Sequence, residues 1–400
     1  MLNWSHMETL KNELLTRGVE NVIPRDLAQE KLASKEPLRI YFGIDPTGAK
    51  LHLGHSVPLR KLKAFGDAGH HIIFVVGSFT AMIGDPSNRD TLREPLTKAQ
   101  VEENFKDYKK QAEKILDLSK VEVRYNHEWL EPLVFSDIIN LASKFTVQQM
   151  LQRDMFDKRL KEGKPVGLHE FLYPLMVGYD SVVLDVDCEL GGSDQEFNML
   201  AGRQLQKNFG KRDKFILTTK LIEGTDGRKM SKTYDNCIYL EDKPNDMYGK
   251  VMSMVDAQVT TYFELCTNLS MTEVSQISTD LEEGKLHPKD AKMRLAREIV
   301  TLYHGEKMAE KAEEDFIKTF SKKGIPEDAP LVQVPLGTKL VDVLLDQKII
   351  ESKSEWRRLV EEGAISNAET EENIKSGDQA VDKNIILKVG KRRFIKIEIL

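Results

Sequence analysis

The chain has 400 residues, with 58 Lys and Arg against 64 Asp and Glu and a formal net charge of −6 at pH 7. Its hydrophobic content of 40% and charged content of 30% are typical of a water-soluble globular protein, and its length predicts two or three domains. No apolar run approaches the roughly 20 residues of a membrane span, and the negative charge argues against indiscriminate nucleic-acid binding while permitting a local basic patch.

Cysteine usage and the first residues bear on the compartment. Cys188, Cys237 and Cys266 are widely spaced and odd in number, and no Cys-x-x-Cys pair occurs. This pattern supports neither a disulfide framework nor a zinc site. Residues 1–6 lack the basic and apolar regions of a signal peptide. We therefore expect a cytoplasmic protein with no bound metal and no membrane association.

The first part of the chain alternates strand and helix patterns. Residues 8–35 read as two short helices around Pro24. The apolar run 38–44 reads as a buried strand, residues 57–68 carry apolar side chains at helical spacing, and the continuously apolar run 71–77 is typical of a central parallel strand. The alternation predicts an α/β fold with a Rossmann-like parallel sheet.

The middle of the chain continues this alternation. The pattern predicts helices over 97–118, 131–162, 168–180 and 195–207, and strands over 121–125, 182–186 and 215–218. Ser193 is placed to cap the helix that begins at Gln195. Residues 145–151 are apolar enough to pack against a partner, although packing in the core is an equal alternative.

From Pro244 onward the pattern is that of helices alone, up to a Gly- and Pro-rich linker at 324–330. The last residues form two short helices and alternating strands. We predict three domains: a Rossmann-like catalytic domain with an inserted helical dimerisation segment at 1–240, an all-α domain at 241–325, and a small α+β domain at 331–400.

The first chemical motif is the turn that follows strand 38–44. It contains His52 and His55, and Gly54 between them leaves room for a flat ring. A strand that leads through a turn into a helix offers backbone N–H groups and the positive end of the helix dipole to an anion. Alone, the two histidines are equally well explained as a helix cap.

The second motif is a polar, glycine-punctuated loop, 223–233, that carries Lys229 and Lys232. Lysine is a mobile cation suited to a polyphosphate, whereas most charge runs are simply solvated. Together the two motifs resemble the HIGH and KMSKS signatures of class I aminoacyl-tRNA synthetases. Their order and the Rossmann-like frame between them make the pair far more specific than either motif alone.

Activation of an amino acid by ATP needs positioning and charge stabilisation more than covalent catalysis. His52 and His55 suit the phosphates and ribose, and Asp194 suits a ribose hydroxyl. Lys229 and Lys232, with Arg89 and Arg93 from the loop after Asp85, suit the departing phosphates. Tyr41 and Asp180 would together select a side-chain hydroxyl; the alternatives are an ordinary strand aromatic and an ordinary residue at a helix C-terminus.

Over essentially its full length the chain resembles the bacterial tyrosyl-tRNA synthetases, in the branch with a KMSKS-type loop. The matching residues are 41–47, 51–55, 83–87, 191–195 and 229–233, with Tyr173 and Asp180. The tyrosine-binding set that the resemblance implies is Tyr41, Asp85, Tyr173, Val177, Asp180 and Gln195. The implied ATP-binding set is Asp45, Gly54, His55, Gly192, Asp194, Met230 and Lys232, and the implied catalytic set is His52, His55, Lys229, Lys232, Thr233, Arg89 and Arg93.

Three positions depart from the family pattern. Val177 stands where a glutamine usually helps to hold the substrate ammonium. Phe42 replaces a cysteine that contacts the ribose in some members. Thr233 closes the lysine loop where serine is common, which keeps the hydroxyl.

The last 65 residues resemble an S4 RNA-binding domain. Their basic residues gather on one helix face and on one hairpin, and the implied RNA-binding set is Lys353, Arg357, Arg358, Lys391, Arg392 and Arg393. Such a patch can follow an RNA backbone. The alternative is a solvated hairpin tip.

The sequence thus predicts a tyrosine–tRNA ligase that uses ATP with Mg²⁺ and L-tyrosine, binds tRNA(Tyr) and forms a homodimer. The nearest alternative is a tryptophanyl-tRNA synthetase, against which the S4-like unit and the Tyr41/Asp180 pair argue. A catalytically inactive RNA-binding paralogue is a third interpretation, and the presence of both histidines and both lysines argues against it.

Overall fold

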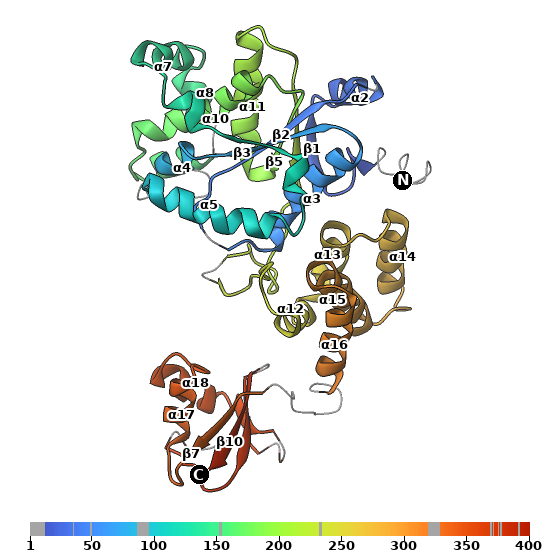
Figure 1. The fold of residues 1–400 in the computed structure, drawn as a ribbon, viewed down its shortest axis with the longest axis vertical. Coiled ribbons are helices and arrows are strands. Elements are labelled where there is room, and N and C mark those ends of the chain that lie inside the picture. Colours follow the sequence, from blue (N-terminus) through green and yellow to red (C-terminus); the bar gives the residue numbers. More distant parts are fainter. Residues whose placement is uncertain are drawn as a thin grey trace. The chain divides into compact units, whose positions relative to one another are not determined.

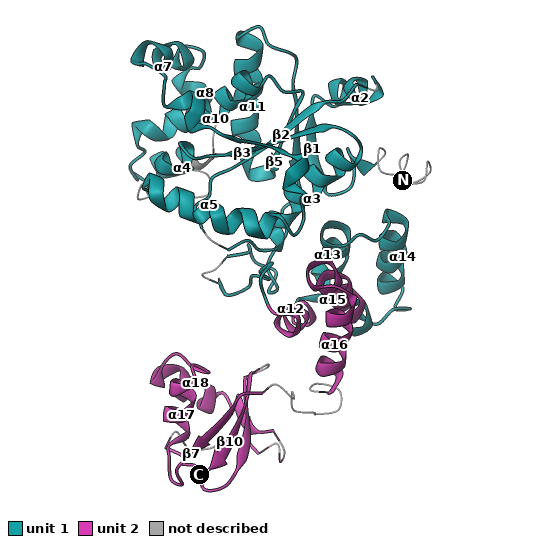
Figure 2. Cartoon of the chain, viewed as in Figure 1, with its two compact units in different colours: residues 1–242, 254–291 teal, residues 243–253, 292–400 magenta. Residues whose placement is uncertain are grey.

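The structure, a computed structural model, describes residues 13–34, 36–48, 50–85, 96–151, 154–231, 234–318, 329–368, 370, 372–374, 376, 378–390 and 393–400. The chain divides into two compact units (Figure 2). Unit 1 comprises residues 1–242 and 254–291, and unit 2 comprises residues 243–253 and 292–400.

Unit 1 is built on a sheet of six strands, counted over the described residues, in the order β1-β6-β5-β2-β3-β4 (Figure 1). β1 is antiparallel to β6, and the other neighbours are parallel. The strands are β1 (Val19–Ile23), β2 (Arg39–Ile44), β3 (His71–Val76), β4 (Glu122–Tyr125), β5 (Cys188–Gly192) and β6 (Phe215–Thr219). This mainly parallel sheet with crossover helices confirms the predicted α/β class.

Helices cover both faces of the sheet, and Figure 1 shows α10 and α11 on one face and α3 and α5 on the other. The helices of the sheet region are α2 (Arg25–Ala33), α3 (Leu53–Asp67), α4 (Thr80–Ile83), α5 (Lys98–Ala112), α6 (His127–Leu130), α7 (Phe135–Ala142), α8 (Val147–Leu151), α9 (Asp154–Lys161), α10 (Leu168–Leu184) and α11 (Glu196–Asn208), with the 3₁₀ turns η1 (Leu118–Lys120) and η2 (Ser193–Gln195). Burial on both faces explains why the central strands read as continuous apolar runs.

Two glycines let α10 and α11 cross closely. A Cβ atom on Gly178 would lie 3.2 Å from the Cα and the N of Gly202. A Cβ atom on Gly202 would in turn lie 2.7 Å from the Ser181 Oγ and 2.8 Å from the Lys214 Nζ. The crossing therefore closes over a buried polar cluster that includes Glu189 of the central strand β5.

Several predicted boundaries were wrong. Residues 19–23 form the edge strand β1 rather than a helix, because pairing with β6 outweighs the local pattern. The predicted strand 182–186 belongs largely to the last turn of α10, and the strand proper is β5, so the apolar run was a buried helix end. Ser193 makes no cap, since it lies in η2 and the N-cap of α11 is Gln195, without a side-chain cap bond.

The predicted strands 38–44, 71–77, 121–125 and 215–218 are confirmed to within two residues. Helix α3 begins at Leu53, four residues before the predicted helix, so the histidine turn is itself the helix N-terminus. The predicted helix 168–180 extends to Leu184, which places Asp180 inside α10 rather than at its end.

The described residues from Asp242 to 318 are mainly helical. They form α12 (Pro244–Met252), η4 (Asp256–Gln258), α13 (Val259–Cys266), α14 (Met271–Glu282), α15 (Pro288–His304) and α16 (Glu306–Phe316). α13 and α14 belong to unit 1, whereas α12 and α16 belong to unit 2 and pack on each other. Among the described residues, no helix combines the length and the apolar character needed to cross a lipid bilayer.

The end of unit 2 is a second sheet, of order β7-β10-β9-β8 in the described residues. Its elements are β7 (Leu331–Val334), α17 (Leu340–Asp346), α18 (Lys353–Glu361), β8 (Ile365–Asn367), β9 (Ile385–Val389) and β10 (Arg393–Ile399). Trp356 on α18 is buried in the core of this sheet with Leu387 and Ile395.

Candidate active site

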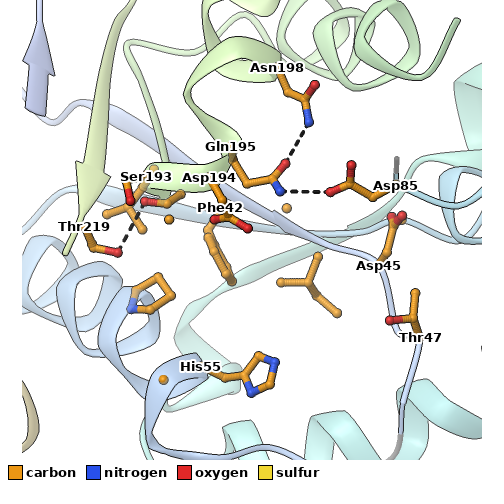
Figure 3. A pocket seen from close by; sticks show the side chains of 18 of the residues that line it. Phe42, Asp45, Thr47, His55, Asp85, Ser193, Asp194, Gln195, Asn198 and Thr219 are labelled. Atoms are coloured by element: carbon orange, nitrogen blue, oxygen red, sulfur yellow. Dashed lines mark hydrogen bonds between the residues drawn. The ribbon is translucent and has the colours of Figure 1, made fainter. Parts of the chain in front are cut away.

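A cavity of about 1130 Å³ opens in unit 1 at the carboxyl ends of the parallel strands. The end of β2, the N-terminus of α3, the middle of α10, the turn after β5 and the loop after β6 all contribute to its lining. Figure 3 shows side chains from several of these segments around one space, among them Asp45 after β2, His55 on α3 and Asp194 after β5. Ligands of open α/β sheets bind at this kind of edge.

The buried end of the cavity holds Tyr41 and Asp180. The Tyr41 hydroxyl donates to the Glu189 Oε1 at 2.6 Å. The Asp180 carboxylate accepts from the Trp129 Nε1 at 2.7 Å and from the Asn126 Nδ2 at 3.4 Å. Burial raises the pKa of Asp180, while these two N–H donors oppose the rise. A phenol and a carboxylate at a closed apolar end form a site for a small polar group.

Five polar side chains form the next part of the cavity. The Asp45 carboxylate accepts from the Tyr173 hydroxyl at 2.8 Å and from the Thr80 hydroxyl at 2.6 Å. The Gln195 amide donates to the Asp85 Oδ2 at 2.8 Å (Figure 3). Burial, followed by the charges of Asp45 and Asp85, raises the pKa of Tyr173. Two carboxylates with a phenol oxygen suit a cationic group such as an ammonium.

Gly77 makes the Asp45 contact possible. A Cβ atom at this position would lie 1.9 Å from the Asp45 Oδ1 and 2.5 Å from the Thr80 Oγ1. Val177, one turn after Tyr173 on α10, lines the same part of the cavity, as does the buried Phe42 on β2.

The two histidines lie at the N-terminus of α3. His52 is the N-cap residue, and its backbone N–H donates to the His55 Nδ1 at 3.2 Å. The ring centroids are 3.9 Å apart. A Cβ atom on Gly54 would lie 3.0 Å from the His52 ring, so only glycine fits without displacing it. Both histidines line the cavity, where the helix N-terminus attracts an anion.

The loop after β6 approaches the same region. Lys229 and Met230 line the cavity, as do Gly192 and Asp194. Burial, followed by the Asp85 charge, raises the pKa of Asp194, and the positive charge of Lys229 opposes this. Lys232, Thr233, Arg89 and Arg93 lie outside the described residues.

Asn236 fastens this loop. Its side chain is buried, and its amide nitrogen donates to the Asp226 Oδ1 at 2.7 Å and to the Lys229 carbonyl at 3.1 Å. Its amide oxygen accepts the backbone N–H of Ser231 at 2.8 Å. One side chain thus holds both sides of the segment that carries Lys229.

The basic residues of the terminal unit lie at its surface. Arg357 and Arg358 are exposed on α18, and Arg358 pairs with Glu362 at 3.1 Å. Lys353 pairs with Asp342 at 3.6 Å, and Arg393 pairs with Glu355 at 3.0 Å. Lys391 and Arg392 lie outside the described residues.

Sequence reasoning missed the residues that support Tyr41 and Asp180. These are Asn126, Trp129, Ser181, Glu189 and Lys214. Glu189 gave one usable signal, since it is a charged residue within the otherwise apolar and glycine-containing strand β5. Among the described residues, no cluster of three or more His, Cys, Asp or Glu side chains could hold a metal ion.

Comparison with known proteins agrees with this geometry. The family model "tRNA synthetases class I (W and Y)" matches residues 33–321. The fold, the histidine turn and the lysine loop thus define a class I aminoacyl-tRNA synthetase.

Relatives that match over nearly the whole chain identify one family within this class. The chain is 45% identical to the tyrosine–tRNA ligase of Thermotoga maritima, over 96% of both chains. It is 44% identical to that of Carboxydothermus hydrogenoformans, over 96% of this chain and 97% of the relative. The chain belongs to the tyrosine–tRNA ligase family.

Solved structures share the fold. A mitochondrial tyrosyl-tRNA synthetase of Aspergillus nidulans, truncated at its C-terminus, matches with a TM-score of 0.65 and 24% identity, over 78% of this chain and 94% of that chain. A tyrosyl-tRNA synthetase of Archaeoglobus fulgidus, complexed with L-tyrosine, matches with a TM-score of 0.62 and 23% identity, over 76% and 98%.

Proposed function

We propose that this chain activates L-tyrosine with ATP and transfers it to the 3′ end of tRNA(Tyr). The observation that carries the proposal is the order of groups along one cavity. A closed end with Tyr41 and Asp180 is followed by the acidic cluster of Asp45 and Asp85, and the anion-binding N-terminus of α3 lines the same cavity. These three environments match the hydroxyl, the ammonium and the phosphates of the reactants.

Each part has a role in this proposal. Tyr41 and Asp180 bind the tyrosine hydroxyl, Asp85 and Tyr173 hold the ammonium, and Gln195 lies on the carboxyl side. The carboxylate of tyrosine then attacks the α-phosphate of ATP, and pyrophosphate leaves. The Mg²⁺ ion enters as the ATP complex.

The phosphate end of the cavity would stabilise the transition state. His52 and His55, with Gly54 between them, face the nucleotide, together with Gly192, Asp194 and Met230. The cations Lys229 and Lys232, with Thr233 and the arginines Arg89 and Arg93, balance the charge that develops on the departing phosphates.

The first test concerns the amino acid. Asp180→Asn and Tyr41→Phe should each lower kcat/KM for tyrosine relative to phenylalanine in tyrosine-dependent pyrophosphate exchange. Loss of one hydrogen bond to a charged group is worth about 1.5–3 kcal/mol, so the ratio should fall roughly 10- to 150-fold for Asp180→Asn. Tyr41 is neutral, and a bond between neutral groups is worth about 0.5–1.5 kcal/mol, so Tyr41→Phe should lower the ratio only about 2- to 10-fold. Thr47→Ser, on the nucleotide side, is the control. Equal ratios in parent and variants would contradict the assignment of the hydroxyl site, and no exchange with tyrosine in the parent would contradict the function.

The second test concerns the lysine loop. Asn236→Ala removes the side chain that holds Asp226, the Lys229 carbonyl and the Ser231 N–H. Because the loop charge is needed in the transition state, adenylate formation should slow at least about tenfold while tyrosine binding stays unchanged. Asn236→Asp keeps the acceptor for the Ser231 N–H but replaces the donor with a carboxylate facing Asp226, so it should slow adenylate formation at least as much as Asn236→Ala. The measurements are pre-steady-state adenylate formation and equilibrium tyrosine binding; weaker tyrosine binding at an unchanged rate would refute the role.

A homodimer is the proposed assembly. A set of large apolar side chains around α7 and α8 is solvent-exposed in the isolated chain: Val134 59%, Phe135 77%, Ile139 55%, Val147 65% and Leu168 80%. A patch of this kind marks a protein interface. The set extends beyond the predicted interface segment 145–151, which contributes Val147.

Phe135→Asp should therefore convert a dimer into a monomer, since a charge at the centre of an apolar interface is not compensated. Sedimentation velocity at micromolar concentration measures the change. Met308→Asp, at an exposed apolar side chain of unit 2, is the control and should leave the mass unchanged. A monomeric parent, or a variant that remains dimeric, would rule out this surface.

We also propose that residues 1–240 are the catalytic domain, 241–325 a helical domain and 331–400 an RNA-binding domain. Lys353, Arg357, Arg358, Lys391, Arg392 and Arg393 would contact the tRNA backbone through their charge. The three cysteines are buried and form no disulfide bond, which is typical of a reducing cytoplasm.

Removal of residues 331–400 should spare pyrophosphate exchange and strongly reduce tRNA charging, because the deleted sheet has its own core and lies far along the chain from the cavity residues. Both activities are measured on the truncated and the full-length protein. Charging at the full rate without these residues would show that tRNA is held elsewhere.

A further inference from the structure

A buried ion pair lies behind Tyr41. Glu189 stands opposite Tyr41 where β2 pairs with β5, and it accepts the Tyr41 hydroxyl proton at 2.6 Å. Its other carboxylate oxygen accepts from the Ser181 Oγ at 3.1 Å and forms an ion pair with Lys214. Lys214 also donates to the Ser181 Oγ at 2.7 Å. The side chains of Lys214 and Glu189 are 0% and 5% exposed, so water does not compete with these bonds.

The surrounding fold makes room for this cluster. Gly202 on α11 passes directly over it, and a Cβ atom there would lie 2.8 Å from the Lys214 Nζ and 3.0 Å from the Glu189 Oε2. Burial lowers the pKa of Lys214, and the charge of Glu189 opposes this. A buried pair of this kind adds little to stability compared with apolar side chains of the same size, so its position calls for another explanation.

Two carboxylates act on the single proton of the Tyr41 hydroxyl. The charges of Glu189 and Asp180 both raise the pKa of Tyr41, after the effect of burial. The Tyr41 hydroxyl donates its hydrogen bond to Glu189 and not to Asp180. Asp180 therefore receives N–H donors from Trp129 and Asn126 but not the tyrosine proton. Asp180 lines the cavity, and a carboxylate can accept more than two hydrogen bonds.

We propose that the Lys214–Glu189 pair is a specificity device that keeps the Tyr41 proton away from Asp180, so that only a hydroxyl on the substrate completes the Asp180 site. This inference rests on the proposed function. A phenylalanine ring would leave a buried carboxylate short of a donor, which is costly. Without the charge of Glu189, Asp180 would be the one left of the two carboxylates whose charges act on the Tyr41 hydroxyl, and the proton would be drawn toward it. The need of Asp180 for a substrate hydroxyl would then be smaller.

The test uses the double variant Glu189→Gln/Lys214→Met, which removes both charges together and leaves neither ion unpaired. A neutral amide accepts less strongly than a carboxylate, so Tyr41 is freed to donate to Asp180. The ratio of kcat/KM for tyrosine to kcat/KM for phenylalanine, measured by pyrophosphate exchange, should fall about tenfold. This ratio is independent of the folded fraction, because both amino acids are activated by the same active molecules.

Asp187→Asn is the matched control. Asp187 is also buried, lies two residues before Glu189, and is bound to Lys31 and Arg212 away from the cavity lining. It should reduce thermal stability and leave the ratio within about twofold, as expected for a purely structural ion pair. If the double variant does not fold, the single variant Glu189→Gln replaces it, since a buried lysine can lose its proton.

The results distinguish a failure of the proposed function from a failure of the proposed role of the ion pair. A parent enzyme without tyrosine-dependent exchange refutes the proposed function. An active parent with an unchanged ratio in a folded variant refutes the role of the ion pair. The parent alone gives a further check: 4-aminophenylalanine, which carries N–H donors, should be activated at least about tenfold better than phenylalanine, and equal activation would overturn the acceptor character of the site.

Discussion

The site depends on the register with which β2 pairs with its neighbours. Pairing with β5 places Tyr41 opposite Glu189, and pairing with β3 brings the end of β2 next to Gly77 and Thr80. Because side chains alternate along a strand, a shift of one residue would turn Tyr41 away from Glu189. A single strand thus fixes the hydroxyl end of the cavity through Tyr41 and the ammonium part through Asp45.

Several carboxylates line this cavity, and the hydrogen bonds that they accept explain the placement of many of its polar side chains. Asp45, Asp85, Asp180 and Glu189 each accept a hydrogen bond from a neighbouring side chain. Repulsion between the carboxylates of Asp45 and Asp85, in the middle part of the cavity, favours the entry of a cation. In the proposed function, this field explains how an ammonium is held although valine at 177 offers no hydrogen-bond acceptor: the attraction comes from the charge of the whole cluster.

The sequence motifs predicted many of the residues that line the site. They did not predict the residues that hold Tyr41 and Asp180 in place. His52, Gly54, Tyr173 and Lys229 lie on local patterns, and the structure brings all four to one cavity. Glu189 and Lys214 act through contacts between strands and helices distant in sequence, so no local pattern marks Lys214, and Glu189 is marked only as a charged residue within a buried strand. The edge strand β1 and the limits of β5 were also missed, since tertiary pairing decides short ambiguous runs.

Helix α10 shows why these supports matter. It carries Tyr173, Val177 and Asp180, and buried charge holds it near both ends. At its start, the Arg159–Glu170 ion pair binds the Pro165 carbonyl and the Gly167 N–H, which fixes the turn that leads into the helix.

Toward the other end of α10, Ser181 joins the Lys214–Glu189 pair beneath the crossing with α11. Buried ion pairs contribute little net stability, but each has narrow geometric requirements. The two pairs contact α10 through Glu170 and Ser181 and hold in place the residues that it turns toward the cavity. In the proposed function, a shift of α10 would let water or a reoriented side chain donate to Asp180. The site would then no longer discriminate between tyrosine, which has a hydroxyl, and phenylalanine, which has a hydrogen atom in its place.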